Sequence, residues 1–101
     1  MGRASFDETI HAPVRLRICG LLRPVDQLDF AVLRDALDVS DATLSKHLKT
    51  LVASGYVSSS KVASAGRDDA RRITWLALTK AGRSAFDAHV LALQQIAGAS
   101  A

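Results

Sequence analysis

The chain has 101 residues, which suits a single domain over 1–101 and leaves no room for a second core of ordinary size. Hydrophobic residues make up 49% and charged residues 23%, a globular composition that argues against disorder. No apolar run reaches the roughly 20 residues that cross a bilayer, and the first residues lack the pattern of a signal peptide. With one cysteine, Cys19, no internal disulfide can form, so we expect a cytoplasmic protein with no membrane partner.

The net charge of +3 is distributed unevenly along the chain. Residues 24–39 hold four aspartates and one arginine, a net charge of −3, whereas residues 40–83 hold eight basic and three acidic residues, a net charge of +5. Such a concentration of cations is expected of a surface that approaches a polyanion. A modest basic excess is also common on an ordinary solvated surface, so charge alone does not decide the function.

Three helices are predicted in the first half of the chain. The first spans residues 13–22, and the second spans 30–37 after a very short strand at 28–29. Ser40 is a good N-cap for the third helix, over about 40–54, which Gly55 ends. Its buried stripe has a period of 3.6 residues and consists of Leu44, Leu48, Leu51 and Val52.

A hairpin and a long helix are predicted in the second half. Residues 56–61 and 73–78 are rich in β-branched and aromatic residues and predict two strands, joined by a polar loop at 62–72. The hairpin, or wing, therefore covers about 56–78, and a last helix capped by Thr79 continues to about residue 97. The fold class is mainly α (α+β), in the order helix-helix-helix-β-hairpin-helix, which is the plan of a winged helix-turn-helix.

A short helix, a tight turn and a second helix with one buried stripe form a helix-turn-helix, whose second helix lies in the major groove of DNA. Small, hydroxyl and amine side chains lie opposite the leucine stripe and can contact bases or phosphates, although any surface helix carries such residues. Lys46 lies most directly opposite the stripe. The exposed face and its flanks comprise Ala42, Thr43, Ser45, Lys46, His47, Lys49, Thr50 and Ala53.

The predicted wing adds a second cationic feature. Its arginines can follow a DNA backbone or enter the minor groove, where the potential is most negative. They can also pair with Asp68 and Asp69 as a surface cluster of small energetic effect, and both interpretations can hold together. The wing candidates for DNA contact are Arg67, Arg71 and Arg72.

Three segments resemble winged-helix regulators of the MarR and ArsR types. VSDATLSKHLKTLVASGYV, residues 39–57, resembles their recognition helix, and WLALTKAGRSAF, residues 75–86, resembles the Leu-Thr-x-x-Gly stretch of MarR-like proteins. HAPVRLRICGLL, residues 11–22, is similar to the first helix of ArsR-like proteins. The resemblance runs from about residue 10 to 96. It implies binding of double-stranded DNA through Ser40, Thr43, Ser45, Lys46, His47, Arg67 and Arg71.

Two positions depart from these families. Asp41 stands where ArsR-like proteins often have an uncharged polar residue, so it can repel phosphate, but we expect it to favour the positive end of the helix dipole. Arg72 lies nearer than Arg71 to the usual arginine position of MarR-like wings. Which wing arginine enters a groove is therefore open.

No catalytic, cofactor or metal site is predicted. Cys19 is the only thiol and is expected to pack as a small hydrophobe, and the three histidines lack the spacing of metal ligands. We expect His89 to be an interface or core residue. Without a glycine-rich phosphate loop or a nucleophile–base pair, the chain is not expected to be an enzyme.

The last helix suggests a homodimer. At 1.5 Å per residue it spans roughly 27 Å, longer than one small domain readily covers, unless it folds back entirely onto its own domain. A two-fold pair would also place two recognition helices for a palindromic site. The predicted interface comprises Leu16, Phe86, His89, Val90, Leu93 and Ile96.

The leading hypothesis is a homodimeric transcriptional repressor that binds specific double-stranded DNA. One alternative is a winged-helix module for protein interaction, which would carry an apolar outward face on the third helix or wing. Another is a sensor of an unknown small molecule, bound in a pocket around Leu16, Cys19 and His89.

Overall fold

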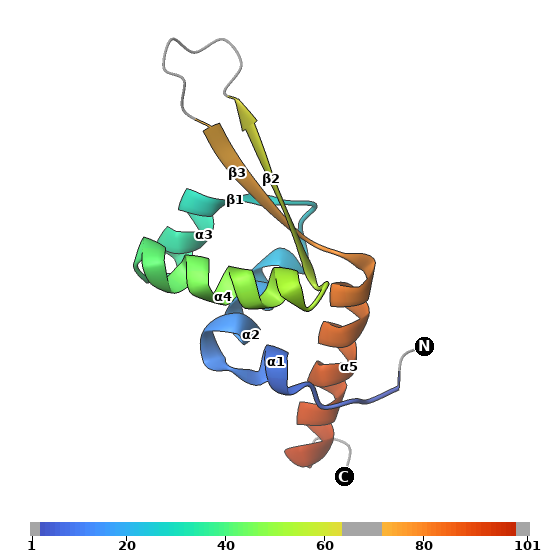
Figure 1. Ribbon diagram of the computed structural model, residues 1–101. Coiled ribbons are helices and arrows are strands. Elements are labelled where there is room, and N and C mark those ends of the chain that lie inside the picture. Colours follow the sequence, from blue (N-terminus) through green and yellow to red (C-terminus); the bar gives the residue numbers. More distant parts are fainter. Residues whose placement is uncertain (1–2, 64–71, 99–101) are drawn as a thin grey trace.

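The computed structural model describes residues 3–63 and 72–98. In these residues the predicted order of helices and hairpin is found, with one additional short helix before the others (Figure 1). The elements are α1 (Glu8–His11), α2 (Pro13–Leu22), β1 (Leu28–Asp29), α3 (Phe30–Leu37), α4 (Asp41–Ala53), β2 (Val57–Ala63), β3 (Arg72–Leu78) and α5 (Lys80–Ile96). The helix α1 was not predicted from the sequence.

The described strands form an antiparallel sheet in the order β1-β3-β2. The register of β2 and β3 runs from Val57 opposite Leu78 to Ala63 opposite Arg72, and β1 pairs with the middle of β3. Val57, Leu76 and Leu78 face the core, whereas the far end of the hairpin extends away from the helices (Figure 1). The hairpin thus forms the predicted wing.

Local signals explain where the helices begin and end. Pro13 occupies the first turn of α2, where the missing N–H has no intrahelical partner to lose. The carboxylate of Asp29 caps α3, and the hydroxyl of Thr79 caps α5 by accepting from the Gly82 N–H at 2.9 Å. Gly55 ends α4 with a φ of 81°, a left-handed conformation that glycine adopts without strain.

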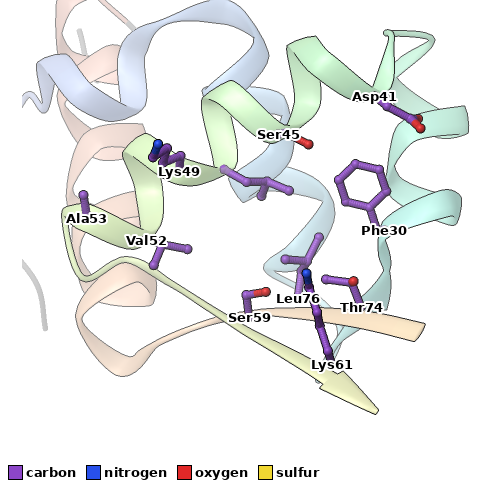
Figure 2. A pocket seen from close by; sticks show the side chains of 11 residues that line it. Phe30, Asp41, Ser45, Lys49, Val52, Ala53, Ser59, Lys61, Thr74 and Leu76 are labelled. Carbon is purple, nitrogen blue, oxygen red and sulfur yellow. The ribbon is translucent and has the colours of Figure 1, made fainter. Parts of the chain in front are cut away.

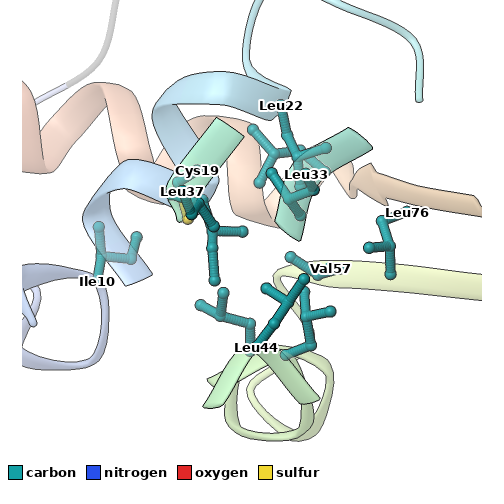
Figure 3. Packing of buried hydrophobic residues seen from close by; sticks show 12 residues of the cluster. Ile10, Cys19, Leu22, Leu33, Leu37, Leu44, Val57 and Leu76 are labelled. Atoms are coloured by element: carbon teal, nitrogen blue, oxygen red, sulfur yellow. The ribbon is translucent and has the colours of Figure 1, made fainter. Parts of the chain in front are cut away.

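One hydrophobic core joins the helices to the base of the sheet (Figure 3). Leu44, Leu48 and Leu51 of the predicted α4 stripe are buried, and Cys19 packs beside them as a fully buried thiol. Val52, predicted in the same stripe, is instead 43% exposed, because it lies about 100° around the helix from Leu51, toward the wing. Burial, with a smaller effect of Asp7, raises the pKa of Cys19 to about 11, so the thiol is an inert packing group at neutral pH. The fully buried members of the core are Ile10, Ile18, Cys19, Leu22, Leu33, Leu44 and Leu51.

The helix α5 packs along α1, α2 and β3 of its own chain. Leu16 and Phe86, both predicted at a dimer interface, pack partly against this chain's core, and His89 is fully buried without a second chain. Val90 and Leu93 are half-buried, and Ile96 is 71% exposed. These outer positions leave apolar surface at the far end of α5, and the interface as a whole stays a prediction.

Candidate nucleic-acid interface

The exposed face of α4 carries a shallow hollow of about 550 Å³. Because the leucine stripe of the helix points into the core, the opposite face is left with small and polar side chains. The residues that line the hollow are Ala42, Ser45, Lys46, Lys49, Thr50 and Ala53. The helix therefore presents small residues, hydroxyls and two ammonium groups together.

A second hollow, a groove of about 690 Å³, lies between α4 and the wing (Figure 2). Ser45, Lys49 and Ala53 line both hollows, so the two form adjoining surfaces on either side of these residues. Lys61 on β2 lines the groove from the wing. The residues that line the groove are Phe30, Asp41, Ser45, Leu48, Lys49, Val52, Ala53, Ser59, Lys61, Thr74 and Leu76.

The predicted contact residues at the start of α4 have different hydrogen-bonding states. The hydroxyl of Ser40 accepts from the Thr43 N–H at 3.1 Å and donates to the Thr43 hydroxyl at 3.0 Å, so it serves as the predicted N-cap. Ser45, Lys46 and Lys49 are exposed, and within the described residues their side chains form no hydrogen bond or salt bridge. Their donors are therefore available to an external partner.

The imidazole of His47 contacts Arg15, a residue that was not among those predicted from the sequence. The Arg15 guanidinium of α2 lies 3.1 Å from Nδ1 of His47, and because a guanidinium only donates, Nδ1 accepts. Burial, followed by the charges of Arg15 and Lys46, lowers the pKa of His47 below its ordinary value. A neutral His47 carries its proton on Nε2, which leaves this N–H as a donor.

The charge of Asp41 is compensated within the chain. Its carboxylate accepts from the Arg34 guanidinium of α3 at 3.0 Å, and the same guanidinium donates to Asp35 at 3.0 Å. Arg34 thus reduces the repulsion that Asp41 would exert on a phosphate. The sequence pattern contained no signal for this pair, since its members are seven positions apart, on either side of the turn between α3 and α4.

The wing candidates are only partly described. Arg67 and Arg71 lie outside the described residues, and Arg72 is the first residue of β3, opposite Ala63. Lys61 is exposed on the neighbouring strand. The role of each wing arginine stays a prediction.

The described residues give no indication of a metal centre or a membrane span. In residues 3–63 and 72–98, no group of three or more histidine, cysteine, aspartate or glutamate side chains is arranged to bind a metal ion. Among the helices of this same part of the chain, none has both the length and the hydrophobicity that spanning a bilayer requires.

An exposed basic helix beside an antiparallel hairpin defines a winged-helix DNA-binding domain. The family model described as "Winged helix DNA-binding domain" matches residues 14–97, so the chain belongs to this family. The family binds DNA and is not enzymatic, which confirms the expectation that the protein is not an enzyme.

The chain is also similar to individual relatives. It is 31% identical over 83 residues to the uncharacterized protein MJ0432 of Methanocaldococcus jannaschii, covering 82% of this chain and 86% of the relative. The transcriptional regulator homologue from Pyrococcus horikoshii OT3 superposes with a TM-score of 0.83 at 24% identity, covering 92% of this chain and 88% of that one. NolR from Sinorhizobium fredii superposes with a TM-score of 0.63 at 26% identity, covering 89% and 78%. The chain thus has the fold of winged-helix transcriptional regulators.

Proposed function

We propose that the protein is a homodimeric repressor of the MarR or ArsR type that acts in the cytoplasm by occupying a promoter. The observation that carries this proposal is the hollow on α4, where exposed Ser45, Lys46 and Lys49 have no partner among the described residues. In duplex DNA the major groove admits a helix, and base edges and phosphates there offer acceptors to hydroxyl and ammonium donors.

In this proposal α4 enters the major groove and the wing follows the neighbouring backbone. Lys49 and Lys61, on the two sides of the groove between α4 and the wing, contact phosphates. His47 donates through Nε2 at the flank of the helix, and Thr43 and Ser45 approach base edges. A wing arginine, Arg67, Arg71 or Arg72, reaches the minor groove.

The dimer is proposed from the far end of α5. Val90, Leu93 and the exposed Ile96 leave apolar surface there, next to the exposed Leu91. Pairing with the same surface of a second copy would remove this area from water. It would also place two copies of α4 for the half-sites of a palindrome.

The test is selection of bound duplexes from a random pool, followed by titration of the selected duplex at salt concentrations between about 50 and 200 mM. We expect a palindromic site and an affinity that falls steeply with salt, because each phosphate contact releases counterions. Lys46→Ala should weaken binding and make the slope of log affinity against log salt shallower by about 1 if Lys46 contacts a phosphate.

Lys80→Ala is the matched control, since Lys80 is exposed at the start of α5 and lines neither hollow. It should leave affinity and salt slope close to those of the unmodified protein. Absence of duplex binding, or binding indifferent to salt, would contradict the proposal. A selected site without two-fold symmetry would contradict the dimer.

A further inference from the structure

A chain of hydrogen bonds holds the N-terminal segment, residues 5–11, across α5. The backbone N–H of Ser5 donates to the Ala88 carbonyl at 3.0 Å, and the N–H of Asp7 donates to Nδ1 of His89 at 2.9 Å. On its other side, Nε2 of His89 lies 3.3 Å from Nδ1 of His11. Three residues of the segment are thus tied to α5.

These contacts require both histidines to be neutral. Because Nδ1 of His89 accepts a peptide N–H, it carries no proton, and the proton of the neutral ring is on Nε2. Nε2–H then donates to Nδ1 of His11, which must also be unprotonated. A proton on Nδ1 of His89 would face the Asp7 N–H, and a proton on Nδ1 of His11 would face the His89 N–H. Protonation of either ring therefore breaks one hydrogen bond and leaves two N–H groups that point at each other without an acceptor.

The surroundings of His89 also oppose a charged ring. Its side chain is 0% exposed, and the ring of Phe6 lies with its centroid 4.7 Å from those of both histidines. The other titratable groups around the network are Asp7, Glu8, Cys19 and Tyr56. Burial and then His11 lower the pKa of His89, and together they outweigh the opposite effect of Asp7 and Glu8.

The same segment supports the base of the DNA-binding elements. One carboxylate oxygen of Asp7 caps α1 by accepting from the Ile10 N–H at 3.0 Å, and the other accepts from the Tyr56 hydroxyl at 2.6 Å. Tyr56 lies between the end of α4 and the start of the wing. Ile10 is fully buried in the core that also contains the stripe of α4. Release of the segment would remove both supports.

We propose that residues 5–11 form an acid-released clasp, in which the neutral His11–His89 pair holds the segment on α5 and uptake of a proton by the pair releases it. His89 binds a proton more readily once the segment is released, so the clasp is complete above the ordinary histidine pKa of about 6.5 and weakens as pH falls below it. Weaker DNA binding in acid follows from the loss of the Tyr56 and Ile10 contacts, and this consequence rests on the proposed function.

The unmodified protein provides the first test. At neutral pH, ¹⁵N NMR of the imidazole should show His89 as the Nε2–H tautomer. The opening equilibrium of the Asp7 and Ile10 amides should be nearly constant from pH 8 to about 6.5. From there to pH 5.5, still above the ordinary range of carboxyl titration, it should rise by up to about tenfold per pH unit, the limit for one proton. The amides of Leu33 and Leu44 should stay protected while the segment opens. The proposal would be overturned if the opening equilibrium of the Asp7 amide did not change with pH. It would also be overturned if this amide exchanged only when the core amide of Leu33 exchanged with it.

His89→Asn provides the second test, because an amide oxygen can accept from the Asp7 N–H but does not titrate in this range. The acid response of the segment should be abolished in this variant. His47→Asn is the control, since His47 is the other histidine whose pKa is lowered but lies outside the network, and it should keep the response. An unchanged acid response in folded His89→Asn, or its loss in His47→Asn, would exclude the clasp.

A DNA titration at pH 7.5 and 5.5 then tests the consequence. The unmodified protein should lose more affinity in acid than His89→Asn does. If no duplex is bound at either pH, the proposed function fails, whereas the hydrogen-exchange result still decides the clasp independently.

Discussion

Two faces of the molecule differ in whether their polar side chains have hydrogen-bond partners within the chain. One face is formed by α5 and the N-terminal segment, and the other by α4 and the wing. On the α5 face, Arg83 donates to the carbonyls of Arg23 and Val25 at 2.9 and 3.1 Å, and His89 has partners at both ring nitrogens. On the α4 face, the exposed side chains of Ser45, Lys46 and Lys49 have no partner among the described residues.

This contrast indicates which polar side chains stabilise the fold and which remain available to a ligand. A donor that is already paired inside the chain must lose that bond before it can bind a phosphate. An exposed unpaired ammonium group contributes little to folding and keeps its donors for an external acceptor. Substitutions of side chains that are paired within the chain should therefore change stability, and substitutions of the exposed unpaired side chains on α4 should change DNA affinity.

The largest effect is expected at Gly82, where α5 crosses the turn after α4. A methyl group at this position would overlap the carbonyl of Tyr56, and that backbone is fixed by the Thr79 N–H at 3.0 Å. Gly82→Ala should reduce the free energy of unfolding by about 3 kcal/mol, measured by urea denaturation. Gly20→Ala is the control, because its methyl would meet only the Phe86 ring at 3.8 Å. It should be neutral or stabilise the helix by up to about 1 kcal/mol, and equal destabilisation by both changes would contradict the close approach at Gly82.

Two serines of α4 offer a sharper contrast within a single helix. Ser40→Ala removes the N-cap and should reduce the free energy of unfolding by about 1 kcal/mol. Ser45→Ala removes an exposed hydroxyl without a described partner, so stability should change by no more than about 0.5 kcal/mol. Its effect should instead be a loss of DNA affinity of about fivefold, the value of one hydrogen bond. If Ser45→Ala destabilised the fold as much as Ser40→Ala, the distinction between side chains paired within the chain and side chains left unpaired would not hold at these positions.

The smallest effect is expected for the ion pair between the residue that follows α2 and a residue of α5. Arg23 and Asp87 form two hydrogen bonds of 2.9 and 3.0 Å, but their side chains are 41% and 50% exposed. The guanidinium lowers the pKa of Asp87, and solvent screens the pair. Asp87→Asn should lower the melting temperature by no more than a few degrees, and the difference should shrink at high salt. A large loss that persists in high salt would show that α5 depends on this pair.

The local structure of the protein could be predicted from its amino-acid sequence. A proline, a serine and a threonine at helix starts, together with the period of the leucines in α4, predicted helices in this order and the buried side of α4. These features were predictable because capping and amphipathic periodicity depend on residues within one or two turns. The four-residue helix α1 was missed because it is too short to show a period.

The contacts between side chains of different elements could not be predicted from the sequence, because they depend on how the helices pack. Arg15 with His47, Arg34 with Asp41, and Asp7 with His89 join different elements, and no local pattern indicates them. Their pairing depends on how the helices pack, which is set by the whole core. The sequence therefore predicted an exposed basic face on α4, whereas packing decided that Asp41 is compensated, that His47 accepts from Arg15 and that His89 is buried under the chain's own N-terminal segment.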